Sequence, residues 1–356
     1  MAPASATDFI IIASNASAMI VPRYIRKGDR LGVTAPSFGV DDPLDANRFA
    51  SARRKLEGMG YGIVETPNVY TTIDEEGRSS PAGQRVSELV SLLEDPEVSC
   101  IFSAKGGDYQ YEMLPLMDWE AYESNPKWFQ GYSDNTTLMF KMTAEHDVAT
   151  VYCGNFGDFG MEEWHPSLRQ NLEFLEGRRS EQSSFPYHAR DFVDRVTGLE
   201  SFQEDEPTVW ASSAGDCRFS GRLIGGCMDV LEWFVNKGTA DASGFVERYG
   251  NDGIVWYMET FDMTEDRIVS MLRRMEDMGW FEDCTGFVFG RPLFYHGDTG
   301  YRELLERELS GLGLPVLTDA DVGHKAPRMT FINGAMAEFS YSDGGCTLRY
   351  DLRCDV

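Results

Sequence analysis

The chain has few features that would tie it to a membrane or cross-link it. Its seven cysteines are widely spaced and form no C-x-x-C pair, which argues against both a disulfide framework and a zinc site. The longest apolar run near the N-terminus, FIII, is too short for a signal-peptide core or a membrane span, and no basic segment precedes it. We therefore expect a protein of the reducing cytoplasm, with residues 1–20 as a tail.

Positive charge is also scarce. Lysine and arginine number 32 against 58 aspartates and glutamates, so the formal net charge is -26. Such an excess repels phosphate backbones and anionic lipids, and we expect no nucleic-acid or membrane partner. Because the acidic residues are scattered along the chain, they indicate a solvated surface. The length of 356 residues and the 42% hydrophobic content are typical of a folded protein with two domains.

The first half of the chain alternates strands with helices. The strand-like run DRLGVTAPS (29–37) is followed by an amphipathic helix and a second strand, YGIVETP, and the alternation continues through VSCIFSA, KWFQGY and VATVYCG. Without hairpin signals, this pattern predicts an α/β domain over residues 21–175, built on a parallel, doubly wound sheet. Ligand sites in such sheets lie at the carboxyl ends of the strands.

The second half has a different character. Residues 176–215 are polar and aromatic without a clear period, and we expect them to connect two domains. Residues 216–356 then show a glycine-rich turn and helix (SGRLIGGCMDVLEWF), a buried strand (GIVWYMET), further helices and strands, and a hairpin that turns at SDGG. They predict a second, α+β domain with more antiparallel strands.

A G-x-S-D turn lies between a predicted strand and a predicted helix, in NPKWFQGYSDNTTLMFKM (125–142). Gly131 leaves room for a tight turn that would lift the Ser133 hydroxyl above the sheet edge, as a nucleophile elbow does, although the usual G-x-S-x-G pattern is absent. The alternative is structural, with Ser133 or Asp134 capping the helix that starts at Asn135. A catalytic role also requires a base and an orienting acid elsewhere in the chain.

Both partners occur at predicted strand ends. Of the five histidines, His324 in DVGHKAP directly follows the strand LPVLTDA, where a catalytic base would be delivered, and His296 in FYHGD is its main competitor. Glu259 ends the apolar strand GIVWYME, and a buried carboxylate there needs a partner such as an imidazole N–H. The order Ser, Glu, His is that of the α/β-hydrolases.

The segment SAKGGDYQY offers backbone donors for an oxyanion. Gly106 and Gly107 follow the strand VSCIFSA and allow the backbone to approach a ligand closely. A phosphate-cradling loop is the alternative, but neither established glycine-rich phosphate motif is present. Two further hypotheses stay open: Cys153, at the end of VYCG, as the nucleophile, and a pocket that binds a small ligand without chemistry.

Together these motifs resemble the LD-carboxypeptidase family of serine peptidases, which also contains the microcin C immunity (MccF-like) proteins. The resemblance runs from about residue 22 to the C-terminus and rests on GDRLGVTAPS, GGD, NPKWFQGYSDNTTL, GRLIGGCMDVLEWF, IVWYMET and VGHKAP. It implies a Rossmann-like N-terminal domain, a smaller β-rich C-terminal domain and a site between them. It also implies a homodimer and no metal or organic cofactor.

The resemblance assigns a role to each candidate residue. Ser133 is the implied nucleophile, His324 the general base and Glu259 the acid that orients it, while the amides of Gly107 and Asp134 hold the oxyanion. The implied activity is hydrolysis of an amide bond in a small peptide or a peptidyl-nucleotide conjugate. The alternative is removal of the terminal D-amino acid from a cell-wall tetrapeptide.

Two departures from the family concern the substrate. The family often has asparagine where this chain has Cys227, and an aromatic residue or asparagine where it has Asp108, which would disfavour anionic substrates. Gly106 and Asp108 are thus expected substrate contacts. The long interdomain segment and VYCGNFGDFGMEEWHP favour the immunity-type branch, in which an aromatic side chain can stack on a nucleotide base. Trp210 is the candidate here, with a core position as the alternative.

Overall fold

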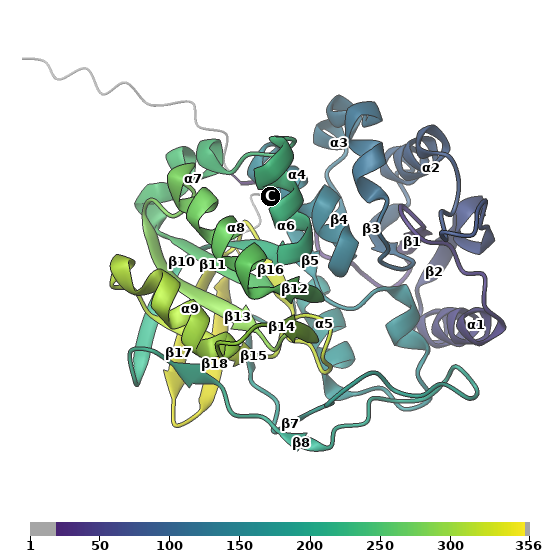
Figure 1. Ribbon diagram of the computed structural model, residues 1–356. Helices are drawn as coiled ribbons and strands as arrows, with labels where there is room; N and C mark the ends of the chain where they lie inside the picture. The colour runs from purple at the N-terminus through teal and green to yellow at the C-terminus, as the bar shows by residue number, and fades with distance from the viewer. Residues whose placement is uncertain (1–18, 353–356) are drawn as a thin grey trace, which may run out of the picture.

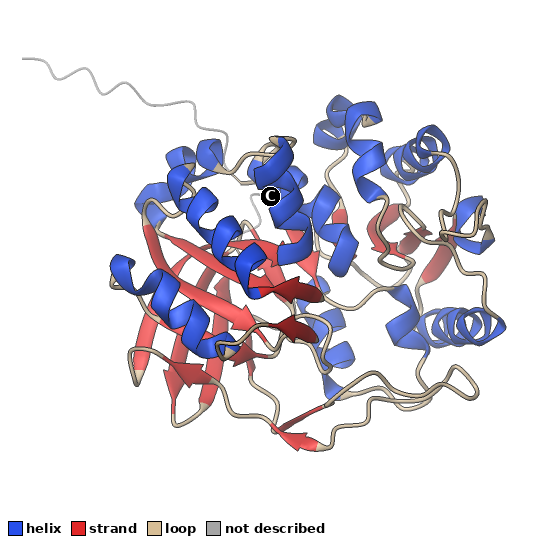
Figure 2. Cartoon of the chain, in the orientation of Figure 1, coloured by secondary structure: helices blue, strands red, loops and turns tan. Residues whose placement is uncertain are grey.

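Two β-sheets with helices around them form the part of the chain described by the computed structural model, residues 19–352 (Figures 1 and 2). One sheet belongs mainly to the N-terminal half and the other to the C-terminal half. Helix α4 (Thr136–Ala144) contacts strands of both. The predicted tail over residues 1–20 falls almost entirely outside the described residues, as does Cys354.

The N-terminal sheet has the strand order β16-β5-β4-β3-β1-β2. Its strands β1 to β5 are all parallel, and only β16 pairs antiparallel, with β5. Their bounds are β1 (Arg30–Thr34), β2 (Gly62–Glu65), β3 (Val98–Ser103), β4 (Trp128–Gly131), β5 (Thr150–Tyr152) and β16 (Phe331–Asn333). The prediction of a parallel, doubly wound sheet is confirmed.

The helices of this half lie between its strands and after β5. They are α1 (Pro43–Gly58), α2 (Ala82–Glu94), α3 (Trp119–Ser124), α4 and α5 (Pro166–Leu175). Asp42 caps α1 by accepting a hydrogen bond from the amide of Leu44 at 2.6 Å. Between β3 and α3, Gln110–Leu116 forms a 3-10 helix that contains Pro115. Proline has no N–H to donate, which disfavours an α-helix there.

The C-terminal sheet has the order β6-β18-β17-β10-β11-β13-β15-β9. Its central strands β10 (Cys217–Cys227), β11 (Ile254–Glu259), β13 (Cys284–Gly290) and β15 (Val316–Ala320) are parallel. The antiparallel character that we expected is confined to the flanking strands β17 (Met336–Ser342), β18 (Gly345–Asp351), β6 (Glu181–Ser183) and β9 (Ala211–Ser212). Strands β17 and β18 form the predicted hairpin at SDGG.

Helices and short strands cover this second sheet. The helices are α6 (Met228–Lys237), α7 (Ser243–Tyr249), α8 (Glu265–Asp277) and α9 (Tyr301–Leu309). Two short strands, β12 (Asp262–Thr264) and β14 (Phe294–His296), pair in parallel beside them. The fold class is thus the expected one, a parallel α/β half joined to a β-rich α+β half.

The predicted glycine-rich turn before α6 is wrong, because SGRLIGG lies inside the long strand β10. Strand β10 packs so closely on β11 that a Cβ on Gly225 would lie 1.7 Å from the backbone oxygen of Tyr257. The glycines thus serve close strand pairing, a tertiary contact that local sequence does not reveal. Helix α6 starts at Met228, directly after the strand.

The segment over residues 176–215 does more than connect. It supplies β6 and β9 to the C-terminal sheet and forms a small hairpin of β7 (Tyr187–His188) with β8 (Glu206–Pro207). It continues as a long loop to α1, where the Asn47 side chain donates to the carbonyl of Thr197 at 2.8 Å (Figure 2). In the opposite direction, β16 of the C-terminal half joins the N-terminal sheet. The chain therefore crosses between the two halves more than once.

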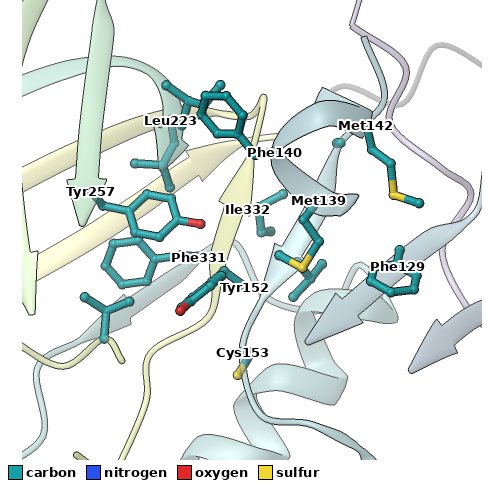
Figure 3. Packing of buried hydrophobic residues seen from close by; sticks show 14 of the residues in the cluster. Phe129, Met139, Phe140, Met142, Tyr152, Cys153, Leu223, Tyr257, Phe331 and Ile332 are labelled. Atoms are coloured by element: carbon teal, nitrogen blue, oxygen red, sulfur yellow. The ribbon is translucent and has the colours of Figure 1, made fainter. Parts of the chain in front are cut away.

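A continuous aromatic core joins the two sheets. Tyr152 of β5, Tyr257 of β11 and Phe331 of β16 pack together, with ring centroids 5.5 Å apart for the tyrosine pair and 4.8 Å apart for Tyr257 and Phe331 (Figure 3). Phe140 of α4 and Leu223 of β10 extend the cluster. Because these residues are closely packed, they fix the carboxyl ends of β5 and β11 next to each other.

Two findings limit the classes of site within residues 19–352. None of the helices there combines the length and apolarity needed to span a bilayer. Nor does that part of the chain bring three or more His, Cys, Asp or Glu side chains into an arrangement that could hold a metal ion.

Candidate active site

Ser133 lies at the apex of a tight turn between β4 and α4. Its backbone has φ +66°, a left-handed conformation that costs energy for a residue with a Cβ. A Cβ on Gly131 would lie 2.8 Å from the Asn135 side chain, so the predicted need for glycine there is confirmed. A residue outside the turn stabilises it, because the amide of Ser133 donates to the hydroxyl of Tyr152 at 3.0 Å. A single 3-10 turn (Ser133–Asn135) precedes α4.

The neighbouring Asp134 fixes the turn to two other loops. One of its carboxylate oxygens accepts hydrogen bonds from the Ser37 hydroxyl at 2.6 Å and from the amide of Gln110 at 3.0 Å. Burial raises the pKa of Asp134, while these hydrogen bonds act in the opposite direction. Among the described residues, neither the Ser133 nor the Asp134 side chain accepts a hydrogen bond from an amide at the start of α4, whereas the Gln110 side chain accepts the amide of Leu138 at 3.0 Å. The structural alternative, in which Ser133 or Asp134 caps the helix, is therefore not what the turn does.

The side chains of Ser133, His324 and Glu259 form one hydrogen-bonded chain. The distance from His324 Nε2 to Ser133 Oγ is 3.0 Å, and the distance from His324 Nδ1 to Glu259 Oε2 is 2.8 Å. Glu259 is the last residue of β11, and His324 follows β15 after a short turn. The carboxyl ends of three parallel strands, β4, β11 and β15, thus deliver the three groups to one point.

Glu259 is fully buried, with 0% exposure. Burial raises the pKa of Glu259, but the charge and hydrogen bond of His324 and the hydroxyl of Tyr152 outweigh it, so the pKa lies below its usual range. The Tyr152 hydroxyl donates to Glu259 Oε1 at 2.5 Å. A Cβ on Gly323, which has φ +106°, would lie 2.5 Å from Glu259 Oε2, so the G-H turn needs its glycine. Glu259 is therefore held as a carboxylate with both oxygens occupied.

Aromatic rings hold the imidazole of His324. Tyr132 and Phe261 contact it with ring centroids 5.2 Å and 4.9 Å away. The guanidinium of Arg328 lies 4.0 Å from the centre of the Tyr132 ring and donates to the backbone oxygen of His324 at 3.3 Å. With its proton on Nδ1 donated to Glu259, the imidazole has Nε2 free to accept the hydroxyl proton of Ser133.

The glycine pair after β3 lies against the serine. A Cβ on Gly106 would be 3.1 Å from Ser133 Cβ and 3.2 Å from its Oγ, so only glycine fits without displacing the hydroxyl. At Gly107, φ is +148° and a Cβ would fall 2.3 Å from Ser37 Oγ. Among the described residues, the amides of Gly107 and Asp134 have no acceptor. Both are therefore available as donors to a ligand.

A pocket of about 350 Å³ opens beside Ser133. One part of its lining is aromatic and another part is acidic, from Asp108 and Asp229. The aromatic residues come from both halves of the chain: Phe38, Tyr111, Trp233 and Phe261. Gly107 and Asp134 also line it. Asp108 thus lies where we expected a substrate contact.

A second cavity, of about 240 Å³, is lined by His324. Tyr132 and Phe192, the latter from the long connecting segment, also form part of its wall. Its lining combines three arginines with three acidic residues: Arg48, Arg195 and Arg328 with Asp158, Asp191 and Glu200. Among the described residues, basic side chains thus line this cavity but not the serine pocket.

Three other candidates from the sequence lie elsewhere. The Trp210 indole is fully buried and donates to Asp321 at 3.2 Å, so the prediction that it stacks on a ligand is wrong and its core position is correct. His296 is exposed and pairs with Asp262. Cys153 follows β5, as predicted, but is only 2% exposed, and burial raises the pKa of its thiol to about 11. A buried neutral thiol is a poor nucleophile.

The sequence did not single out three residues that shape this site. Tyr152 bridges Ser133 and Glu259, Phe261 packs on the imidazole, and Asp229 accepts the amides of Phe261 and Asp262 at 3.0 and 3.1 Å. One signal for Phe261 is its position two residues after Glu259, just beyond a strand end. Tyr152 gave no such signal, because an aromatic residue in an apolar strand is equally typical of a core.

Fold and site together define an α/β protein in which the carboxyl ends of strands from two sheets place a hydroxyl, an imidazole and a carboxylate in one hydrogen-bonded chain. Residues 31–153 match the family model described as the LD-carboxypeptidase N-terminal domain, and residues 220–339 match that of the LD-carboxypeptidase C-terminal domain. The chain therefore belongs to the LD-carboxypeptidase family of peptidases.

Similar proteins include both named branches of this family. A Vibrio cholerae protein named as a carboxypeptidase is 28% identical, covering 87% of this chain and 92% of its own. The microcin C7 self-immunity protein MccF of Escherichia coli is 24% identical, covering 83% and 86%. A structure of MccF with adenosine monophosphate has a TM-score of 0.76 at 20% identity, covering 94% of this chain and 98% of the other. At that identity the structural likeness shows the fold.

Proposed function

We propose that the protein is a serine-type hydrolase that cleaves an amide bond in a small peptide or an aminoacyl-nucleotide conjugate. The observation that carries the proposal is the hydrogen-bonded chain from Ser133 through His324 to Glu259, set in a turn with two unused backbone amides. A hydroxyl, an imidazole and a buried carboxylate in this order are the groups that nucleophilic acyl transfer requires.

The reaction begins when Ser133 Oγ attacks the carbonyl carbon and its proton passes to His324 Nε2. The resulting oxyanion is held by the amides of Gly107 and Asp134, which are fixed before the substrate arrives. Glu259 keeps the Nδ1 proton in place and stabilises the imidazolium. When the intermediate collapses, Nε2 returns the proton to the departing amine, and a water molecule then hydrolyses the acyl-enzyme by the same route.

The two cavities offer places for the two halves of the substrate. Because the departing amine takes its proton from Nε2, we infer that the leaving half extends toward the cavity that His324 lines. The acyl half then occupies the pocket lined by Ser133, Gly107 and Asp134.

Two substrate classes fit this division. Structures of the relative MccF are titled as complexes with aspartyl sulfamoyl adenosine and glutamyl sulfamoyl guanosine, which favours an aminoacyl-nucleotide conjugate. The Vibrio cholerae relative and a Bacillus subtilis protein named as a murein peptide carboxypeptidase favour removal of a C-terminal D-amino acid instead. We expect a homodimer in either case.

The test is a side-by-side hydrolysis assay read by mass spectrometry. Wild type and Ser133→Ala are each offered a tetrapeptide with a terminal D-amino acid and an aminoacyl sulfamoyl adenosine. Cleavage of either one by wild type alone supports both the nucleophile and the substrate class. Equal cleavage by the Ser133→Ala variant would contradict the proposal.

A binding protein without chemistry is the competing function. It would keep the pocket and bind the same ligands, but it would not activate Ser133. A fluorophosphonate probe separates the two, because the probe forms a covalent adduct only with an activated hydroxyl. Failure of the probe to react anywhere in the chain would favour the binding protein.

A further inference from the structure

The amides of Gly107 and Asp134 belong to two loops that one buried hydroxyl joins. Ser37, the last residue of DRLGVTAPS, donates from its Oγ to the Asp134 carboxylate at 2.6 Å and accepts the amide of Tyr109 at 3.1 Å. Asp134 follows β4, and Tyr109 lies in the loop after β3 that contains Gly107. A Cβ on Gly107 would lie 2.3 Å from Ser37 Oγ, so the hydroxyl lies directly against that glycine.

The residue after Ser37 fixes the direction of the Gly107 amide. The amide of Phe38 donates to the carbonyl oxygen of Gly106 at 3.2 Å. That carbonyl and the N–H of Gly107 belong to one planar trans peptide group, in which they point in opposite directions. Because the bond from Phe38 holds the carbonyl, the N–H of Gly107 is held in a single direction as well.

Residues 35–37 are themselves anchored by buried side chains. Ser79 donates from its amide to the carbonyl of Ser37 at 3.0 Å and from its hydroxyl to the carbonyl of Ala35 at 2.6 Å. The Arg85 guanidinium donates to the carbonyl of Pro36 at 3.0 Å. Ser37, Ser79 and Arg85 each have 0% exposure, and Ser37 does not line the serine pocket. Ser37 therefore supports the site from inside the protein, where substrate does not reach it.

We propose that Ser37 is a positioning residue of the oxyanion site, whose hydroxyl holds the loops of Gly107 and Asp134 at the spacing that lets both amides bind one oxygen atom. This inference rests on the proposed function, because an oxyanion forms there only if Ser133 is the nucleophile. Donors that are fixed in advance stabilise the developing charge, and removal of one donor outright costs about 10²–10³-fold in rate. Loosening two donors should cost less, roughly 10- to 50-fold, and should leave ground-state binding unchanged.

Ser37→Ala removes the link between the loops and leaves each loop its other contacts. The amide of Tyr109 loses the acceptor that the structure gives it. The Asp134 carboxylate keeps the amide of Gln110 at 3.0 Å and the hydroxyl of Thr137 at 3.2 Å. The variant therefore tests how the two loops are held relative to each other, while the serine turn keeps two of its anchors.

The experiment measures how fast a fluorophosphonate probe reacts with Ser133. In this reaction Ser133 Oγ forms a bond to phosphorus, fluoride leaves, the hydroxyl proton passes to His324, and the phosphoryl oxygen takes the place of the oxyanion. Rates at several probe concentrations separate the maximal rate, kinact, from KI, the concentration that gives half of it. We expect Ser37→Ala to lower kinact roughly 10- to 50-fold and to leave KI within about twofold of wild type. A wild-type kinact, or a change in KI alone, would overturn the inference.

Thr143→Val is the matched control. Thr143 lies on α4, has 0% exposure and donates its hydroxyl to the carbonyl of Val148 at 2.9 Å, so this variant also loses one buried hydrogen bond. It should keep kinact within about twofold of wild type, and a loss as large as that of Ser37→Ala would contradict the specific role of Ser37. The pH dependence of kinact in Ser37→Ala should match wild type, because His324 and Glu259 are unchanged. A shifted midpoint would show that Ser37 acts through the base instead.

Asp134→Asn weakens the same link by another route. The asparagine oxygen can still accept the Ser37 hydroxyl, but a hydrogen bond to a carboxylate is roughly twice as strong as one to a neutral group, so kinact should fall about three- to tenfold. Because asparagine has the shape of aspartate, this variant decides the question if Ser37→Ala does not fold, and an unchanged kinact would then overturn the inference.

The same assay keeps this inference separate from the proposed function. Equal labelling of wild type and Ser37→Ala at Ser133 would overturn the role of Ser37 and leave the hydrolase standing. Absence of labelling in wild type would contradict the hydrolase, and with it the oxyanion on which the inference rests.

Discussion

Tyr152 is a positioning residue, and its replacement by phenylalanine should slow the reaction without changing substrate binding. Its hydroxyl accepts the amide of Ser133 at 3.0 Å and donates to Glu259 at 2.5 Å, so a single oxygen links the strained turn to the buried carboxylate. Tyr152 is 1% exposed and does not line the serine pocket. The variant therefore leaves the substrate surface as it is and removes only the link.

The size of the effect follows from the groups left without a partner. A hydrogen bond to a charged group contributes about 1.5–3 kcal/mol, and a buried amide left unpaired costs about 1–3 kcal/mol. If about 1.4–2.7 kcal/mol of this is lost in the transition state, kcat falls roughly 10- to 100-fold, since each 1.36 kcal/mol is a factor of ten. KM should stay within about twofold of wild type.

The assay compares Tyr152→Phe with Tyr257→Phe on the substrate that wild type cleaves. Tyr257 is the matched control, because it packs against Tyr152 in the same core, while its hydroxyl makes no hydrogen bond to Ser133, Glu259 or His324 (Figure 3). We expect the control to keep kcat within about threefold of wild type. A Tyr152→Phe variant with wild-type kcat, or one in which only KM rises, would refute the positioning role.

Three further predictions concern residues of the same site. Glu259→Gln should lower kcat about 10⁴-fold with little change in KM, because the amide no longer fixes the tautomer of His324, and steady-state kinetics that show less than a tenfold loss would contradict this. Iodoacetamide at pH 7.5 should leave activity unchanged, because Cys153 is buried and its pKa is raised to about 11, and a Cys153→Ala variant should be fully active in the same assay. Gly106→Ala should reduce kcat at least tenfold, because its Cβ would lie 3.1 Å from Ser133 Cβ, and thermal unfolding should show a Tm within about 4 °C of wild type.

The positions of Ser133, Glu259 and His324 at strand ends could be predicted because each follows a short apolar run. Such runs read as buried parallel strands, and the carboxyl ends of parallel strands face the same edge of a sheet. The structure places Glu259 at the end of β11 and His324 just after β15. Local sequence patterns thus predicted the strands, and the shared direction of parallel strands predicted that the residues at their carboxyl ends lie close together.

What local patterns could not supply depends on contacts between distant segments. The glycines of β10 resemble a turn until their pairing with β11 is known, because glycine by itself disfavours a strand. From the sequence, Trp210 was a candidate for an exposed aromatic surface. In the structure, its indole N–H donates in the core to Asp321, 111 residues away. Tyr152 is separated from Glu259 by 107 residues. Each of these assignments depends on a contact between segments that come together only in the complete fold.

Reaction of the folded protein with a fluorophosphonate probe, mapped by mass spectrometry of its peptides, tests most directly whether Ser133 is an activated nucleophile. We predict a single adduct on the peptide that contains Ser133, formed at least 100-fold more slowly in His324→Ala because the hydroxyl then has no base. The absence of an adduct, an adduct on another residue, or equal labelling of His324→Ala would contradict the account.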